Sequence, residues 1–191
     1  MNVFKPGRRN LAARRFRQGR GGLAVGMEWV AGLLLAALIS TTVRAEPLPS
    51  PTEPVILTLA GKIAKTNHDD QARFDLPMLA ALGEQRLSTS TVVTDGVNAF
   101  VGVWLRDVLA AVGAEGDTVV ATALNDYRIE IPVEDFFEYQ VLLAWEMDGE
   151  RLTPRDKGPL WIVYPRDDHV RLQDIRYDYR WVWQLERLDV K

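Results

Sequence analysis

Three short stretches of the sequence bring together side chains that suit a small-ligand site. Carboxylates and amides accept hydrogen bonds, cations donate them, and aromatic rings offer flat apolar faces. In the second stretch, charged and turn-forming residues run directly into an apolar segment, which places polar groups at the rim of a core. The candidate ligand-binding residues are Asn125, Asp126 and Tyr127, then Arg155, Asp156, Lys157 and Trp161, and finally Arg180 and Trp181.

Each stretch also has a purely structural interpretation. Asn125 and Asp126 favour a turn between two strands. Asp156 and Lys157 form an adjacent pair of opposite charges, which at a surface contributes about 0–1 kcal/mol. Tryptophans such as Trp183 are typical of core packing. Both interpretations stay open at this point.

The sequence predicts neither catalytic residues nor a metal site. It has no cysteine and only two histidines, which excludes thiolate nucleophiles, zinc ribbons, iron–sulfur clusters and any cysteine-ligated metal. His68 and His169 lie in polar segments, and nothing predicts a serine beside either of them. The stretch Asp167–His169 is typical of a solvated loop, with a metal cluster as the alternative.

The charge is divided unevenly along the chain. Residues 1–45 carry eight Lys and Arg and one acidic residue, a net charge of +7, whereas residues 46–191 carry 15 basic and 25 acidic residues, a net charge of −10. The basic start followed by the apolar run 29–39 predicts a signal peptide over 1–45, with an uncleaved anchor as the alternative. We expect a periplasmic protein that does not insert in the membrane after cleavage and does not bind nucleic acid.

A proline-rich linker is expected over 46–54, followed by one domain over 55–191. Asp75 is a candidate helix cap with Pro77 in the first turn, and the apolar spacing of 105–112 predicts an amphipathic helix that ends at Gly113. A helical turn is expected at 133–137. Strands are expected at 55–63, 89–94, 99–103, 118–123, 127–131, 141–145, 160–164 and 181–186. These elements predict an α+β fold with a mainly β core.

Four motifs in this order resemble the molybdopterin-binding domain of sulfite-oxidase-type oxidoreductases. They are Gly102-Val103-x-Leu105, the strand and proline of 127–132, the segment 142–152 with Asp148-Gly149, and Gly158-Pro159-Leu160. The resemblance covers about Val55 to Val190 and implies that family's fold. The family's enzymes bind molybdenum through one cysteine before the Gly-Val motif, where this chain has Ser90-Thr91-Val92-Val93. Trp161 also stands where those enzymes usually carry an arginine.

The sequence is similar to a smaller branch of that family, exported proteins that bind a reduced pterin without a metal. This resemblance implies a sensory partner of a membrane-bound cyclic-di-GMP enzyme, docked on that enzyme's periplasmic region. A pterin offers two adjacent N–H donors and a carbonyl, which suits a carboxylate from Asp126 or Asp156, a cation and an aromatic face. The alternatives are a molybdopterin-dependent oxidoreductase subunit and a ligand-free periplasmic interaction module.

Overall fold

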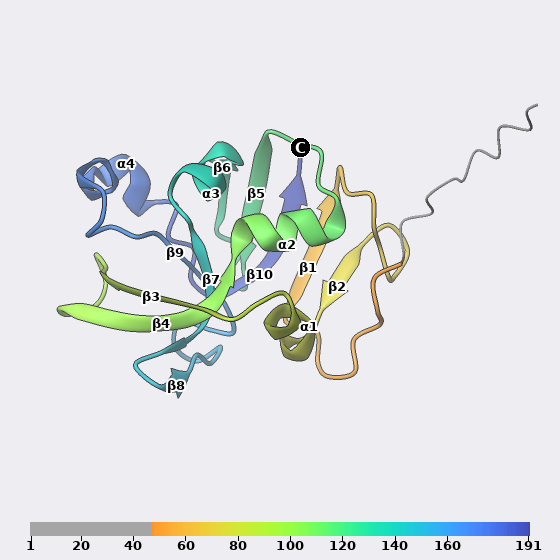
Figure 1. Cartoon of the computed structure of the whole chain (residues 1–191), viewed down its shortest axis with the longest axis horizontal. Coiled ribbons are helices and arrows are strands. Elements are labelled where there is room, and N and C mark those ends of the chain that lie inside the picture. Colours follow the sequence, from red (N-terminus) through yellow and green to blue (C-terminus); the bar gives the residue numbers. More distant parts are fainter. Residues whose placement is uncertain (1–46) are drawn as a thin grey trace, which may run out of the picture. The chain divides into compact units, whose positions relative to one another are not determined.

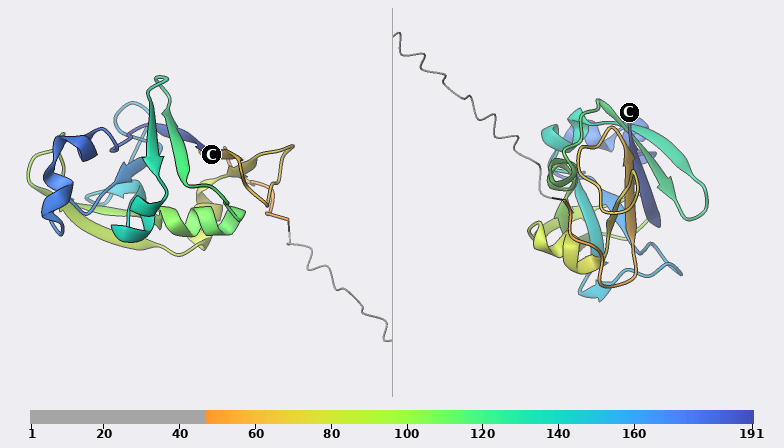
Figure 2. Two further views of the ribbon diagram at one scale, coloured as in Figure 1. Left: turned by 90° about the horizontal axis from the view of Figure 1, so that it is seen from above. Right: turned by 90° about the vertical axis from the view of Figure 1, so that its right-hand side faces the viewer.

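The computed structural model describes residues 47–191, which form two sheets with short helices around them (Figures 1 and 2). The expected signal peptide lies outside the described residues. The first sheet has the strand order β2 (Ala72–Phe74), β1 (Leu57–Gly61), β10 (Leu185–Val190), β5 (Thr118–Ala123) and β6 (Arg128–Pro132). The second contains β3 (Gln85–Ser90), β4 (Val97–Trp104), β7 (Leu142–Met147) and β8 (Glu150–Arg151), with β9 (Trp161–Val163) also paired to β7. The expected mainly β class is confirmed.

The helices are short and lie mostly in the connections between strands. They are α1 (Leu76–Ala81), α2 (Leu105–Val112), α3 (Glu134–Glu138), the 3₁₀ helix η1 (Val170–Gln173) and α4 (Ile175–Asp178). The predicted helix at 105–112 is confirmed, because its leucine and valine side chains form one buried stripe and Gly113 ends it with a left-handed φ of 60°. No helix within residues 47–191 is long and apolar enough to cross a membrane.

Asp75 ties the proline-rich segment to the domain. Its carboxylate caps α1 by accepting the backbone N–H of Met78 at 2.9 Å, and it accepts the N–H groups of Thr52 at 2.6 Å and Glu53 at 3.0 Å. Burial alone raises the pKa of this carboxyl, but the hydrogen bonds from Met78, Glu53 and Thr52 outweigh it and the net pKa is lowered. The predicted cap is confirmed, and it has a second role in holding 52–53.

The core between the sheets is centred on Trp161 in β9. Its side chain is fully buried, with the ring of Phe100 edge-on at 5.4 Å and that of Trp181 at 6.3 Å between centroids. All three residues of β9 are buried, as expected of a continuous apolar run. Trp161 therefore packs in the core, whereas the core packing predicted as the alternative for Trp183 is wrong, since Trp183 is 39% exposed.

Two strands lie elsewhere than predicted. The strand expected at 89–94 occupies 85–90, because Thr91 turns the chain: its Oγ1 accepts the N–H of Val93 at 3.1 Å and lies 2.7 Å from Oγ1 of Thr94. The strand expected at 181–186 starts only at Leu185, after Gln184 with a left-handed φ of 51°. Both segments thereby become loops, and both reach the candidate site.

Candidate ligand-binding site

Three loops surround a cavity of about 310 Å³. They join β3 to β4, β5 to β6, and α4 to β10; the tip of the β3–β4 hairpin and α4 lie at the same end of the domain (Figure 1). The volume of the cavity is at the small end of the range for ligand sites, and the cavity lining is mostly apolar. The lining residues are Val92, Val93, Asn125, Tyr127, Asp178, Tyr179, Trp181 and Trp183.

The β5–β6 loop forms one wall through a tight turn. Asn125 Oδ1 accepts the N–H of Tyr127 at 3.1 Å, and Asp126 between them adopts a left-handed φ of 64°. The hydroxyl of Tyr127 donates to the carbonyl of Tyr179 across the cavity at 2.9 Å. Burial, together with the nearby Tyr179, raises the pKa of Tyr127. Asn125 and Tyr127 therefore line the cavity, whereas Asp126 is exposed and is not a lining residue.

The β3–β4 loop forms the second wall and is fixed by Asp167. The carboxylate of Asp167 accepts the N–H of Ser90 at 2.6 Å and its hydroxyl at 2.5 Å. These bonds from Ser90 hold the pKa of Asp167 below its ordinary value. The loop consequently presents Val92 and Val93 to the cavity.

The segment between α4 and β10 forms the third wall and is anchored by Arg180. Its guanidinium pairs with Asp135 of α3 and lies 4.6 Å from the centroid of the Tyr177 ring. Asp135 also accepts the hydroxyl of Tyr164 at 2.8 Å. Burial, with the Asp135 carboxylate beside it, raises the pKa of Tyr164 well above its ordinary value. Arg180 is thus engaged in holding the wall, and it is not among the residues that line the cavity.

Two polar atoms of this wall have no hydrogen-bond partner within residues 47–191, although both are buried. They are Oδ1 of Asp178 and Nε1 of Trp181. An unpaired buried polar atom costs about 1–3 kcal/mol, and more when it is charged. Both atoms have essentially no accessible surface, so they lie behind the cavity lining, and Asn98 Oδ1, Trp161 Nε1 and Arg166 Nε are unpaired in the same way.

Sequence reasoning found three of the eight lining residues and missed the other five, which are Val92, Val93, Asp178, Tyr179 and Trp183. The signal was present in the run Tyr177-Asp178-Tyr179, where an acidic residue sits between two aromatic residues and next to the candidates Arg180 and Trp181. The alternation of residues 181–186 predicted a strand there, so the loop between α4 and β10 was not expected.

The remaining predicted residues lie apart from this cavity. Lys157 Nζ lies 2.9 Å from Asp156 and 6.0 Å from the centroid of the Trp161 ring, while Arg155 is exposed. Asp156 lines a different, polar hollow with Met147 to Thr153. None of these four is a lining residue of the cavity between the three loops, so any ligand contact they make stays a prediction.

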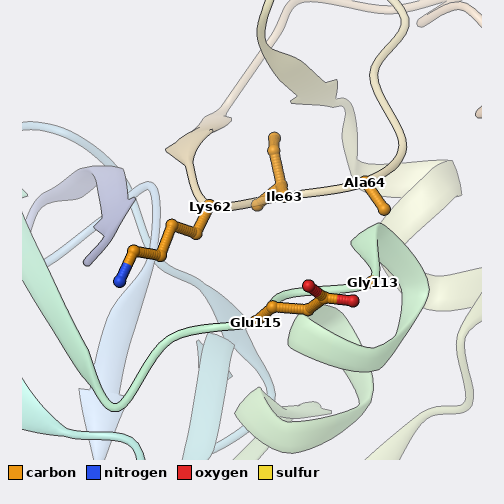
Figure 3. Close-up of a pocket in the computed structure, with 5 residues that line it drawn as sticks. All are labelled: Lys62, Ile63, Ala64, Gly113 and Glu115. Carbon is orange, nitrogen blue, oxygen red and sulfur yellow. The ribbon is translucent and has the colours of Figure 1, made fainter.

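A further hollow of about 250 Å³ lies where the end of β1 approaches the end of α2 (Figure 3). Its lining consists of Lys62, Ile63, Ala64, Gly113 and Glu115, without an aromatic ring. The Lys62 and Glu115 side chains extend in different directions in Figure 3. This hollow has no stacking surface, which separates it from the cavity at the loops.

A test of fit separates the pterin ring from the metal. The aromatic lining of the cavity, with the one acidic residue Asp178, suits a flat heterocycle. The chain has no cysteine, so it supplies no thiolate for molybdenum, and residues 47–191 contain no group of three or more metal-ligating side chains. The residues present fit the organic part of the family's cofactor and not a protein–molybdenum bond.

Comparison with known proteins agrees with the fold and the motifs. Residues 83–170 match the oxidoreductase molybdopterin binding domain family. The structure is similar to the sulfane dehydrogenase SoxCD from Paracoccus pantotrophus, with 18% sequence identity and a TM-score of 0.54. That match covers 75% of this chain and 40% of the SoxCD chain. No curated protein matches the sequence. The predicted resemblance to the sulfite-oxidase-like molybdopterin-binding domain is thereby confirmed by the family match over residues 83–170 and by the shared fold.

Proposed function

We propose that this protein binds a reduced pterin in the cavity between the three loops, without a protein–metal bond. The observation that carries the proposal is the mostly apolar, aromatic lining of this cavity, with Asp178 as the one acidic residue among the lining residues. Stacking of a base on an aromatic side chain contributes about 1–3 kcal/mol, and a pterin ring has a comparable face. Val92 and Val93 add apolar contact where a thiolate would otherwise stand.

The rim of the cavity also suits a docking partner. Val92 and Val93 are each 45% exposed, Tyr179 is 58% exposed and Trp183 is 39% exposed. Exposed apolar side chains gathered at one place are typical of a protein contact. We therefore extend the proposal to a periplasmic sensor that docks on the periplasmic region of a membrane-bound cyclic-di-GMP enzyme.

Ligand and partner would be coupled because they share these side chains. A pterin that packs against Tyr179 and Trp183 restricts the surface that the partner contacts, so the loaded and empty protein differ in affinity for it. By linkage, the partner must change the affinity for the pterin by the same factor. Titrating the pterin with and without the partner's periplasmic region measures this factor, and a factor of one contradicts the sensor.

Binding itself is tested by calorimetric titration of the purified protein with tetrahydropterin under anaerobic conditions. We expect saturable binding together with quenching of tryptophan fluorescence, because Trp181 and Trp183 line the cavity. Glu115→Ala, at the hollow of Figure 3, is the control and should bind equally well. We expect a micromolar Kd. If neither heat nor quenching is observed at a pterin concentration about 100 times this Kd, the proposal is contradicted.

A molybdopterin-dependent oxidoreductase subunit is the second candidate function. The match of residues 83–170 to the family model and the fold shared with SoxCD favour it. Elemental analysis of protein purified from its own host separates the two functions. Stoichiometric molybdenum supports the oxidoreductase, whereas a fluorescent pterin released without molybdenum supports the metal-free binding protein.

A further inference from the structure

We propose that Asp95 is a site of spontaneous covalent modification: it isomerises to isoaspartate, whereas Asp148, in the same dipeptide context, is protected. The sequence has two Asp-Gly dipeptides, Asp95-Gly96 and Asp148-Gly149. The first connects the antiparallel strands β3 and β4, and the second connects β7 and β8 (Figure 1). Glycine has no side chain to shield its backbone nitrogen, which favours attack of that nitrogen on the preceding carboxyl group.

The reaction needs no reactant other than water. The backbone nitrogen of Gly96 attacks Cγ of Asp95, a Cγ–oxygen bond breaks, and one water leaves with the protons of the nitrogen and of the carboxyl group. Water then adds to the main-chain carbonyl carbon of Asp95 in the resulting succinimide and breaks its bond to nitrogen. The main chain now runs through Cγ and is one carbon longer, with no net change in mass, charge or oxidation state.

The glycines do not distinguish the two dipeptides. Gly96 has a φ of 69° and Gly149 a φ of 83°, and a Cβ placed on either would meet no atom within 4 Å. Both glycines and both aspartates are exposed. The space around the attacking nitrogen is therefore open in both connections, and the difference must lie in the carboxyl group that is attacked.

The carboxylate of Asp148 is held and that of Asp95 is not. Asp148 accepts the backbone N–H of Ala99 and the side-chain amide of Asn98, each at 2.8 Å. These hydrogen bonds from Ala99 and Asn98 also hold the pKa of Asp148 below its ordinary value, and cyclisation consumes the protonated carboxyl. Asp95 makes no hydrogen bond or ion pair within residues 47–191. Its carboxyl is free to turn towards the nitrogen of Gly96.

Isomerisation of Asp95 would lengthen a loop whose two ends are fixed. Ser90 and Val97 are partners in the β3–β4 ladder, and Asp167 accepts the N–H and the hydroxyl of Ser90. The extra main-chain carbon must therefore be accommodated within residues 91–96.

The same loop forms one wall of the cavity, which Val92 and Val93 line. We expect the isomerised protein to bind tetrahydropterin about 5-fold or more weakly, as for the lost contact of one or two methyl groups. This consequence rests on the proposed pterin binding, whereas the modification of Asp95 does not.

The modification is tested on the purified protein after storage at physiological temperature and mildly acidic pH. Peptide mapping with electron-transfer fragmentation quantifies isoaspartate at each dipeptide, because isomerisation leaves the mass unchanged. The same protein in urea gives the intrinsic rates of the two dipeptides. Relative to these rates, we expect Asp148 to isomerise at least about 10-fold more slowly than Asp95 in the folded protein, because its two hydrogen bonds must break first.

Two variants sharpen the test. Asn98→Ala removes one of the hydrogen bonds to Asp148 and should accelerate isomerisation there, with no change at Asp95. Asp95→Glu keeps the charge, but its longer side chain closes the corresponding imide ring far more slowly. Storage should therefore weaken pterin binding by the wild-type protein and leave binding by Asp95→Glu unchanged. Circular dichroism verifies that both variants are folded.

The outcomes separate the modification from the proposed function. Equal relative rates at Asp95 and Asp148 in the folded protein contradict the modification, whatever the protein binds. Isoaspartate at Asp95 with unchanged pterin affinity contradicts the effect on the cavity wall. If neither fresh nor stored protein binds tetrahydropterin, the proposed function fails, and peptide mapping alone decides the assignment of Asp95.

Discussion

The core around Trp161 and the cavity at the three loops are built from the same kinds of aromatic side chain. In the core, Phe100 and Trp181 pack on Trp161, which is fully buried. At the cavity, Tyr179 is 58% exposed and Trp183 is 39% exposed. Trp181 belongs to both regions, since its ring packs in the core while it lines the cavity. The comparison teaches that the protein buries one set of rings in its core and leaves the other set accessible at the cavity, where we propose that a ligand binds.

Removing the central ring of the core should have the largest effect. Trp161→Ala is expected to lower the free energy of unfolding by about 3–5 kcal/mol, because the cavity it leaves has no solvent access and few ways to collapse. Urea denaturation followed by circular dichroism measures the loss, and Trp161→Phe should recover part of it. A loss below about 1 kcal/mol in Trp161→Ala places this tryptophan outside the core.

Breaking the anchor beneath the cavity wall is expected to rank next. Asp135→Ala leaves the guanidinium of Arg180 and the hydroxyl of Tyr164 without their common acceptor, at a cost of about 3 kcal/mol. Ligand affinity should fall as well, since Arg180 holds the wall that carries Asp178 and Trp181. Unaltered pterin affinity in a folded Asp135→Ala variant contradicts the anchoring role.

Removing the charge of Asp75, whose carboxylate caps α1 and holds residues 52–53, should have a smaller effect on stability, and this effect should depend on pH. Its folded pKa is lowered, so its stabilisation is complete above the unfolded value of about 3.9 and is lost as pH falls through the folded pKa. Asp75→Asn should cost about 1 kcal/mol at neutral pH and should flatten the decline of stability below about pH 4. Urea titrations from pH 7 to pH 3, with Asp70→Asn as control, check this. If the unfolding free energies of wild type and Asp75→Asn change in parallel with pH, the role assigned to the Asp75 carboxylate is contradicted.

Trp183→Ala should barely change stability, which makes it the sharpest contrast with Trp161→Ala. Its ring is 39% exposed, and we expect a loss below about 1 kcal/mol in unfolding. Pterin affinity should nevertheless fall about 5- to 150-fold, corresponding to about 1–3 kcal/mol of stacking. Equal pterin affinity in wild type and variant would move the ring-binding surface to Tyr127 or Tyr179.

Elements with a strong local signal were predictable. The helix at 105–112 follows from apolar residues at helical spacing with Gly113 behind them, and the strand at 118–123 has the predicted bounds. Asp75 was predictable as a cap because it directly precedes Leu76 and Pro77. In each case the residues that decide the conformation are neighbours in sequence.

The site was less predictable, because its geometry depends on contacts between distant segments. Thr91 to Thr94 is β-branched and looks like a strand, yet Asp167 binds Ser90 and the chain turns there. Residues 181–183 alternate like a strand, yet Arg180 is held by Asp135, 45 positions earlier. Asp178 lines the cavity because α4 ends there and β10 starts only at Leu185, and a sequence does not display that connection.

The pairing of β1 with β10 has a consequence for synthesis. These are the first and last strands of the described residues, they run parallel, and β10 lies between β1 and β5 in the middle of its sheet. A chain emerging from the ribosome therefore has no neighbour for β1 on that side until residues 185–190 have been released. The sheet is therefore completed only once residues 185–190 are available, and removal of residues 185–191 should leave a polypeptide that aggregates or is degraded.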